Sequence, residues 1–334
     1  MNYIGSKFKL SSWIEDEVIK VVGDDLSEKV FCDIFAGTGI VGRTFKGKVK
    51  KVISNDLEHY SYILNKNYIE NIDTITDSKA LIHELNTLPL IDNGFIYQHY
   101  CMGSGSQRQY FSDENGKKID TIRTKLNLWK SEQRIDEQVY HFLLASLIES
   151  ADKVANTASV YGAFLKHIKK SADKPLLLEP AYFKEDNNQH EVYNSDSNIL
   201  IKEISGDILY LDPPYNHRQY SANYHILNTI SLYDNFIPKG KTGLREYNRS
   251  DYSKKREVHS SFESLIKDAN FSTIFLSYNN EGLMSKEEVE TIMKKYGSYT
   301  LVQKEYQRFK ADKTENRNHK ANKTFEYLHI LEKC

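Results

Sequence analysis

Apolar and polar positions along the chain follow two different periods, and the changes of period divide the sequence into three parts. Near the N-terminus, residues 6–22 carry apolar side chains at helical spacing, and the apolar runs 29–35 and 51–54 are typical of buried strands. Helices are predicted to begin near Ile40 and to span 57–69. Strand, turn, helix and strand in this order predict a parallel sheet.

The middle third of the chain lacks this alternation of strand and helix. Three helical patterns are predicted there, over 75–85, 119–129 and 136–150. Polar sequence with four glycines fills 94–116. We therefore expect residues 75–190 to form an inserted, mainly helical domain, with 1–74 and 191–334 forming one α/β domain around it.

Alternation resumes after about residue 199. Strands are predicted over 207–211 and 271–277, and helices over 222–233 and 286–296. Two further runs, 299–309 and 324–331, are predicted to pair as antiparallel strands. The expected fold class is therefore α/β, with a mostly parallel sheet that includes one antiparallel strand, and with an inserted helical domain.

Composition excludes several classes of protein. The chain has 334 residues, 40% hydrophobic and 27% charged, which is typical of a soluble globular protein. No apolar run approaches the roughly 20 residues of a membrane span, and the first residues do not resemble a signal peptide. Cys32, Cys101 and Cys334 are far apart and form no C-x-x-C pair, so we expect no metal site and a cytoplasmic location.

The formal net charge of −1 does not by itself indicate a nucleic-acid-binding protein. Positive charge is local, however. The stretches 238–257 and 301–325 each hold seven Lys or Arg against three acidic residues. Such runs are either solvated loops or contacts for phosphate groups, and charge alone leaves both interpretations open.

A glycine turn follows the first predicted strand. In Asp33-Ile34-Phe35-Ala36-Gly37-Thr38-Gly39, the glycines allow a ligand to approach the backbone, and Asp56 after the second strand can accept hydrogen bonds from a ribose. Residues 37–42 also fit G-x-G-x-x-G, so a nicotinamide dinucleotide is an alternative ligand. Asp33 and Phe35 before the turn favour S-adenosylmethionine, because dinucleotide turns usually follow a purely apolar strand.

The second motif is Asp212-Pro213-Pro214-Tyr215, directly after the strand predicted at 207–211. Each proline fixes φ and lacks an N–H donor, so the turn is rigid and its carbonyls are available as acceptors. Asp212 adds a carboxylate and Tyr215 adds a flat ring. Together they suit a planar ring that carries an exocyclic amino group. The alternative is a turn in which the aspartate only caps the backbone.

Together these motifs resemble those of the S-adenosylmethionine-dependent DNA adenine-N6 methyltransferases, in the Dam-like α-group. The resemblance covers most of the chain and implies a Rossmann-like methyltransferase sheet with an inserted target-recognition domain. It implies Asp212, Pro213, Pro214 and Tyr215 as catalytic residues. The cofactor-binding residues that it implies are Tyr3, Lys7, Asp33, Phe35, Gly37, Gly39, Asp56, Asp196 and Asp212.

The same resemblance implies double-stranded DNA as substrate, a flipped adenine, direct in-line transfer and a modification role in a prokaryotic or phage-encoded restriction–modification system. A cognate restriction endonuclease is then a functional partner, and the family expectation is a monomer. Candidates for reading base edges in the insert are Arg108, Gln109, Arg123 and Lys166.

Four alternatives to this function stay open at the level of the sequence. They are an RNA adenine methyltransferase, a catalytically idle nucleic-acid-binding subunit with the same fold, a nicotinamide-dependent oxidoreductase and an N4-cytosine methyltransferase. The last group usually has serine at the position of Asp212.

Overall fold

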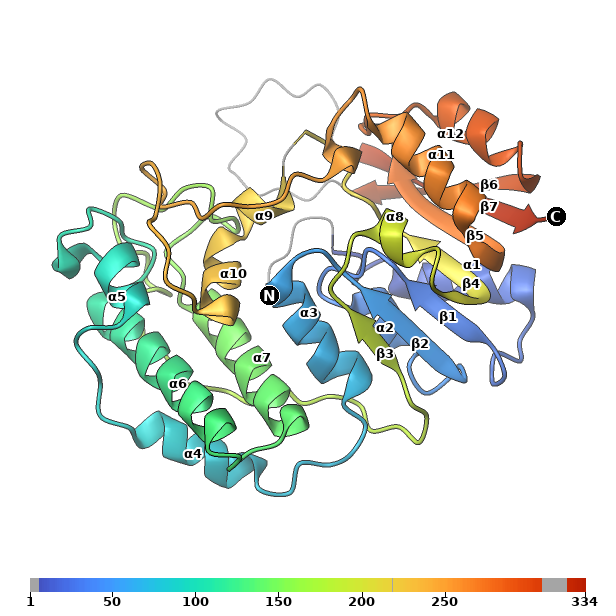
Figure 1. Cartoon of the computed structure of the whole chain (residues 1–334). Helices are drawn as coiled ribbons and strands as arrows, with labels where there is room; N and C mark the ends of the chain where they lie inside the picture. The colour runs from blue at the N-terminus through green and yellow to red at the C-terminus, as the bar shows by residue number, and fades with distance from the viewer. Residues whose placement is uncertain (1–5, 218, 308–322) are drawn as a thin grey trace. The chain divides into compact units, whose positions relative to one another are not determined.

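The computed structural model describes residues 6–217, 219–307 and 323–334, and it divides the chain into two compact units. The first unit consists of residues 1–4, 58–185 and 220–248, and the second of 5–57, 186–219 and 249–334. Figure 1 shows the first unit as helices and the second around a sheet.

The second unit is built on a seven-stranded sheet in the order β3-β2-β1-β4-β5-β7-β6 (Figure 1). Its strands are β1 Val30–Asp33, β2 Lys51–Asn55, β3 Glu191–Tyr193, β4 Ser205–Leu211, β5 Asn270–Asn279, β6 Gly297–Gln307 and β7 Lys323–Lys333. The strands β1 to β5 pair in parallel, whereas β7 is antiparallel to both β5 and β6. The prediction of a mostly parallel sheet with an antiparallel strand is confirmed.

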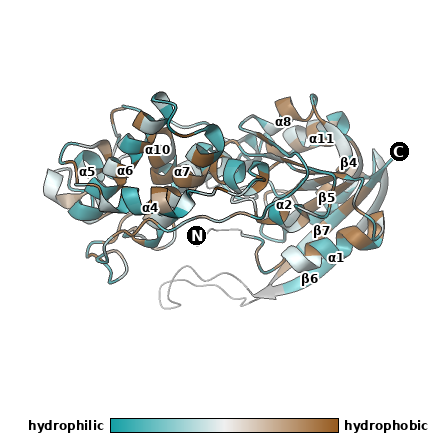
Figure 2. Cartoon of the chain, turned by 90° about the horizontal axis from the view of Figure 1, so that it is seen from below, coloured by the Kyte–Doolittle hydropathy of each residue, from teal (hydrophilic) through white to brown (hydrophobic). Residues whose placement is uncertain are grey.

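Helices cover both faces of this sheet. They are α1 Ser11–Val22, α2 Ile40–Phe45, α8 Ser197–Leu200, α11 Val258–Asp268 and α12 Lys286–Met293. Figures 1 and 2 place α1 on one side of the sheet and α8 and α11 on the other. Apolar residues of β4 and β5 pack against α11, where Phe262, Leu265 and Ile266 are fully buried at helical spacing.

The first unit packs helices around a separate apolar core. Its helices are α3 His59–Asn65, α4 Ser78–Thr87, α5 Phe95–Tyr100, α6 Asp113–Ser131, α7 Glu137–Lys153, α9 Tyr220–Asn223 and α10 His225–Leu232, and a π-helical turn, Lys66–Glu70, continues α3. Figure 2 shows brown hydrophobic stretches on α7 and α10. Trp129, Leu143 and Ile226 are fully buried within this core.

The bounds of the two units differ from the predicted division into 75–190 and the rest. Segments 58–74 and 220–248 belong to the helical unit, because α3 and α10 pack against each other and against α7. The predicted helix 222–233 is in fact two helices, α9 and α10. That the helical unit recognises the target stays a prediction.

None of the helices in the described parts of the chain combines the length and the hydropathy that crossing a membrane requires. Within the same residues, no group of three or more His, Cys, Asp or Glu side chains is arranged to hold a metal ion.

Candidate active site

The two sequence motifs lie at the same edge of the sheet. β1 pairs in parallel with β2 on one side and with β4 on the other, and Asp33 is in register with Ser54 and Tyr210. The glycine turn after β1, Asp56 after β2 and Asp212 after β4 therefore follow the carboxyl ends of three neighbouring strands. In an open parallel sheet, this edge at the point where the strand order changes direction is where ligands bind.

The glycine turn has a backbone that favours glycine at two positions. Gly37 and Gly39 have φ of 52° and 74°, and Gly39 is the N-cap of α2. The Gly37 N–H donates to Asp56 Oδ2 over 2.7 Å, which connects the turn to the end of β2. Asp56 therefore lies beside the turn, and its role toward a ribose stays a prediction.

Asn55, which the sequence analysis missed, joins three segments of this edge. Its side-chain amide donates to the carbonyls of Ile34 and Ser195, at 3.0 and 3.1 Å, and its oxygen accepts from the Ser195 N–H at 3.0 Å. Asn55 is 1% exposed. A buried amide with three such bonds fixes the spacing between the glycine turn and residues 194–196. Asparagine next to Asp56 was the available signal.

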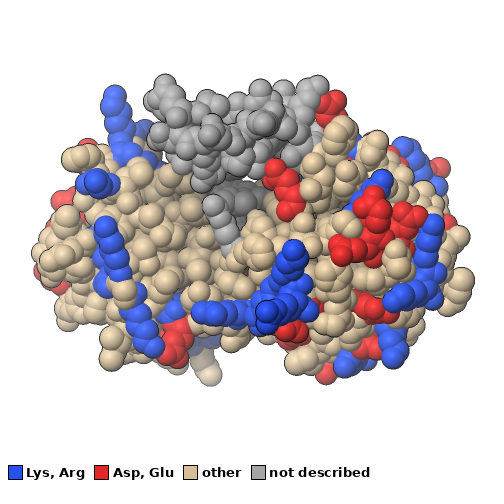
Figure 3. Space-filling view, turned by 90° about the horizontal axis from the view of Figure 1, so that it is seen from above, with Lys and Arg blue, Asp and Glu red and all other residues tan. Residues whose placement is uncertain are grey.

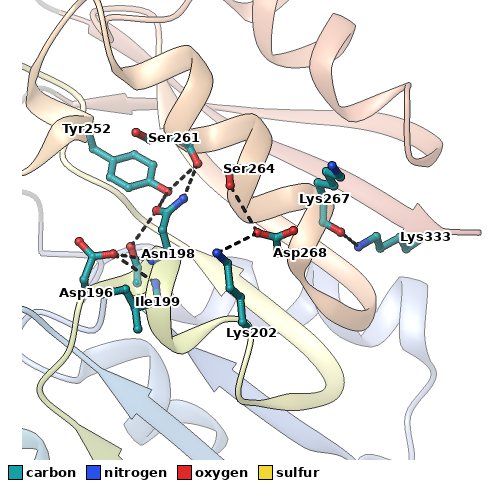
Figure 4. Close-up of polar contacts among 11 residues, drawn as sticks. Asp196, Asn198, Ile199, Lys202, Tyr252, Ser261, Ser264, Lys267, Asp268 and Lys333 are labelled. Carbon is teal, nitrogen blue, oxygen red and sulfur yellow. Dashed lines mark hydrogen bonds and ion pairs between the residues drawn. The ribbon is translucent and has the colours of Figure 1, made fainter.

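Asp196 is exposed and acts as the N-cap of α8, where its carboxylate accepts from the N–H groups of Asn198 and Ile199 (Figure 4). The Asn198 side chain in turn accepts from the Tyr252 hydroxyl and donates to the Ser261 carbonyl of α11. Tyr252 lies edge-on to Phe35, with ring centroids 4.9 Å apart. Through Tyr252, α8 and α11 are thus connected to Phe35, which directly precedes the glycine turn.

Asp33 is a buried acid with an unused acceptor. It is 1% exposed, and Oδ1 has no hydrogen-bond partner among the described residues. Burial, and then the neighbouring Asp212 carboxylate, raise the pKa of Asp33 well above its usual value, against the backbone N–H groups of Gly42 and Phe35. Such an orphaned oxygen is costly unless a donor or a cation meets it.

At the end of β4, Asp212 pairs with the buried ammonium of Lys7, with Nζ 3.1 Å from Oδ1. The pKa of the Asp212 carboxyl is raised to about 6, mainly by burial and also by the Glu326 carboxylate, while the Lys7 ammonium acts to lower it. Although burial lowers the pKa of Lys7, the carboxylates of Asp212 and Glu326 raise it well above its usual value. The Asp212 side chain stays 19% exposed, so the corner is open to a ligand.

The rest of the Asp-Pro-Pro-Tyr corner is held by β5 and by the segment that follows it. Pro213 is buried, whereas Pro214 and Tyr215 are half-buried. The Tyr215 carbonyl accepts from the Leu283 N–H over 3.0 Å, and its ring lies edge-on to Tyr278 with centroids 6.3 Å apart. Lys7 Nζ lies 5.9 Å from the centre of the Tyr215 ring. Tyr3 lies outside the described residues.

Two of the candidate base-reading residues have other contacts. Arg123 is 3% exposed and donates to the carbonyls of Ile230 and Ser231, so the prediction that it reads bases is wrong. Arg108 donates to the carbonyls of His99, Gly240 and Lys241, which uses its guanidinium within the helical unit. Gln109 is half-buried and Lys166 is exposed.

Basic residues of 238–257 are partly neutralised. Lys239, Arg245 and Lys254 pair with Glu246, Asp234 and Asp251. Lys241, Arg249, Lys255 and Arg256 are exposed. Most of the other predicted basic stretch, 301–325, lies outside the described residues. On the face drawn in Figure 3, blue basic and red acidic side chains are interspersed.

A glycine turn and a rigid Asp-Pro-Pro-Tyr corner at the carboxyl edge of such a sheet are the features of a Rossmann-like methyltransferase. The sequence pattern of the D12 class N6 adenine-specific DNA methyltransferases matches residues 3–292. The chain belongs to this family and is an adenine-specific DNA methyltransferase.

Relatives agree with this assignment. The chain is 67% identical over 333 residues to the type II methyltransferase M.NlaIII of Neisseria lactamica, covering 100% of this chain and 99% of the relative. It is 40% identical to M.FokI of Planomicrobium okeanokoites, of which it spans 53%, and 38% identical to M.CviAII of Paramecium bursaria Chlorella virus 1, over 93% of each chain. These matches support the main interpretation and not the oxidoreductase, RNA, cytosine or idle-subunit alternatives.

Proposed function

We propose that this enzyme takes its methyl group from S-adenosylmethionine bound at the carboxyl ends of β1 and β2, and transfers it to an adenine flipped out of double-stranded DNA. The observation that carries the proposal is the register of β1 and β4, which puts the glycine turn and the Asp212 corner side by side. The orphaned Oδ1 of buried Asp33 supports a cationic ligand there.

The cofactor would be held by Asp33, Phe35, Gly37, Gly39, Asp56 and Asp196, with Tyr3 and Lys7 from the N-terminal segment. When bound, it supplies an electrophilic methyl group. The half-buried ring of Phe35, which packs edge-on against buried Tyr252, offers a flat apolar surface for a purine. Asp56 accepts from the Gly37 N–H, so its part in binding a ribose depends on its remaining acceptor positions.

At the corner, the Asp212 carboxylate and the Pro213 carbonyl would accept the two hydrogens of the adenine amino group. The nitrogen then becomes more tetrahedral, and its lone pair turns toward the methyl group. Tyr215 would stack on the extruded base and recover part of the few kcal/mol that flipping costs. After the nitrogen is methylated it loses one proton, which the Asp212 carboxylate accepts. Positioning and electrostatic preorganisation supply most of the rate.

Asp212→Asn tests the acceptor role, since the amide keeps the shape of the side chain but loses the charge. We expect methyl transfer to unmethylated DNA to fall by about 100-fold or more, with S-adenosylmethionine binding changed far less. The exposed Asp24→Asn serves as the control and is expected to keep full activity. Turnover of Asp212→Asn close to that of the parent enzyme would contradict the proposal.

We further propose that the enzyme is the modification component of a prokaryotic or phage-encoded restriction–modification system, acting as a cytoplasmic monomer. Its similarity to three type II methyltransferases supports this role. Sequencing that detects methylated bases, on DNA from cells that express the chain, is expected to show N6-methyladenine within one short sequence. Methylation scattered without a common sequence would count against a site-specific role.

A further inference from the structure

A second carboxylate shares the lysine of the Asp212 corner. Lys7 Nζ lies 2.9 Å from Glu326 Oε1 and 3.1 Å from Asp212 Oδ1. The Ser277 hydroxyl donates to the same Glu326 oxygen over 2.7 Å. Lys7, Glu326 and Ser277 are 7%, 4% and 0% exposed, so these contacts are shielded from water.

Glu326 enters the corner from the antiparallel part of the sheet. It lies on β7, opposite Asn279 of β5 and Lys304 of β6. The family pattern that identifies the enzyme ends at residue 292, so neither that pattern nor the sequence motifs point to Glu326. The network brings together the segment before α1 and the strands β4, β5 and β7.

Because two carboxylates share the Lys7 ammonium, each forms a weaker ion pair with it than a single carboxylate would. In a buried site, a lysine that pairs with a single carboxylate binds that carboxylate tightly. The carboxylate is then a weaker hydrogen-bond acceptor for a ligand. Glu326 attracts the Lys7 ammonium away from Asp212, and the hydrogen bond from the Ser277 hydroxyl fixes the Glu326 carboxylate beside Lys7. The second oxygen of Asp212 then stays available to a ligand.

We propose that Glu326 is a positioning residue for methyl transfer. It orients Lys7 and limits its hold on Asp212, so that the Asp212 carboxylate accepts a hydrogen of the adenine amino group. The inference rests on the proposed role of Asp212. Asp212 in turn raises the pKa values of Asp33 on β1, Tyr210 on β4 and Tyr215 within the corner, and Lys304 is the register partner of Glu326 on β6.

Opposite effects of two charge-removing variants test this inference. The measured quantity is the single-turnover rate constant of methyl transfer as a function of pH, with DNA and S-adenosylmethionine saturating. Glu326→Gln leaves Lys7 to Asp212 alone, so we expect the acid limb to move to lower pH and the plateau to fall about tenfold. Lys7→Met should move the acid limb to higher pH.

Two further variants separate positioning from a general structural effect. Ser277→Ala keeps the charge of Glu326 but removes the hydrogen bond that fixes its carboxylate. We therefore expect the acid limb to move in the same direction as in Glu326→Gln, but by less. Glu332→Gln, an exposed glutamate on the same strand, is the matched control and should leave the profile unchanged. The dissociation constant of S-adenosylmethionine is expected to stay within about threefold for Glu326→Gln, less than about 1 kcal/mol.

An unchanged acid limb and plateau in Glu326→Gln would overturn the inference, as would shifts in the same direction for Glu326→Gln and Lys7→Met. If Glu326→Gln fails to fold, Ser277→Ala decides, and an unchanged profile there overturns it. An active Asp212→Asn would instead refute the proposed acceptor role itself. An inactive Asp212→Asn with an unaltered Glu326→Gln refutes only the positioning role.

Discussion

Two carboxyl groups, those of Asp212 and Glu326, pair with one ammonium, that of Lys7, and the buried carboxyl of Asp33 neighbours Asp212. At the scale of the residue, this arrangement has an excess of negative charge where the proposed cofactor carries a cationic sulfonium. The raised pKa of Asp212, about 6, shows that the site without ligand disfavours full ionisation. A cationic ligand would relieve this cost, so the charge of the site suits the proposed cofactor.

The affinity for S-adenosylmethionine should depend on pH. A cation favours the ionised carboxylate, so below about pH 6 binding must displace the proton of Asp212, and the affinity falls by up to about tenfold per pH unit. Calorimetric titration from about pH 5 to 8 measures it. Adenosine, which lacks the positive charge, is the control ligand and should bind with little dependence on pH.

Asp212→Asn removes the titrating group and should flatten the pH dependence for S-adenosylmethionine. Equal slopes for the two ligands in the parent enzyme would show that the charge of the site does not contribute to binding.

Residues within a motif were predictable, because the motif is local in sequence. Asp212–Tyr215 and Gly37–Gly39 lie where the sequence placed them, each after an apolar strand. Glu326 and Ser277 were missed, since Glu326 reaches Lys7 and Ser277 reaches Glu326 from strands far along the chain, and neither has a distinctive neighbour in sequence. Arg123 was misjudged because an arginine on a polar helix gives no sign that its guanidinium caps the end of another helix.

At the scale of the element, the carboxyl ends of the strands are joined by side chains as well as by the sheet. Asn55 connects the turn after β1 with residues 194–196 after β3, and Asp56 connects the same turn with β2. The geometry of the cofactor edge therefore depends on a buried amide that would not itself contact the reacting atoms.

Asn55→Ala should lower the free energy of unfolding of the sheet unit by about 1–3 kcal/mol, since the Ser195 N–H and two carbonyls lose their partner in a buried place. It should also weaken S-adenosylmethionine binding, because the glycine turn loses its spacing to residues 194–196. Urea unfolding and calorimetry measure the two effects.

Asn188→Ala is the control for this substitution. Its side chain donates to a single carbonyl, that of Val49, away from the turn. A small loss of stability with unchanged cofactor binding is expected. Cofactor binding by Asn55→Ala equal to that of Asn188→Ala would contradict the role given to Asn55.

Elements with a clear apolar pattern were predicted, and those whose pattern was too short or was hidden by flanking residues were not. The strands β1, β2, β4 and β5 were found from their apolar runs. β3 has three residues, too few to show a period. α11 begins directly after the basic stretch 238–257, which hid its helical spacing. α6 begins well before the predicted 119 because Ser112 caps it through the Asn115 N–H.

At the scale of the whole molecule, the chain has almost no net charge, so affinity for DNA must depend on local basic residues. Ion pairs engage three of the basic residues in 238–257, whereas Lys255 and Arg256 are exposed just before α11. The division into units was only partly predictable, because residues 220–248 follow the catalytic corner in sequence but pack with the helices.

The double variant Lys255→Gln/Arg256→Gln should lower the slope of log Kd against log salt concentration by up to about two, because each of the two cations neutralises at most one DNA phosphate. Titration of labelled duplex DNA at several salt concentrations measures this slope. Lys50→Gln, which removes an exposed lysine paired with Glu28, is the control and should leave the slope unaltered. An equal slope for the double variant would show that this stretch is a solvated surface.

The three cysteines give each unit a reporter of its own. Cys32 in β1 and Cys101 after α5 are fully buried, one in the sheet unit and one in the helical unit, while Cys334 is exposed. A thiol reacts only when a reagent reaches it. Under native conditions, a maleimide would therefore modify Cys334 at once and the other two only as their units transiently open. The two slow labelling rates then report the opening equilibria of the units separately, in one intact chain without any engineered residue.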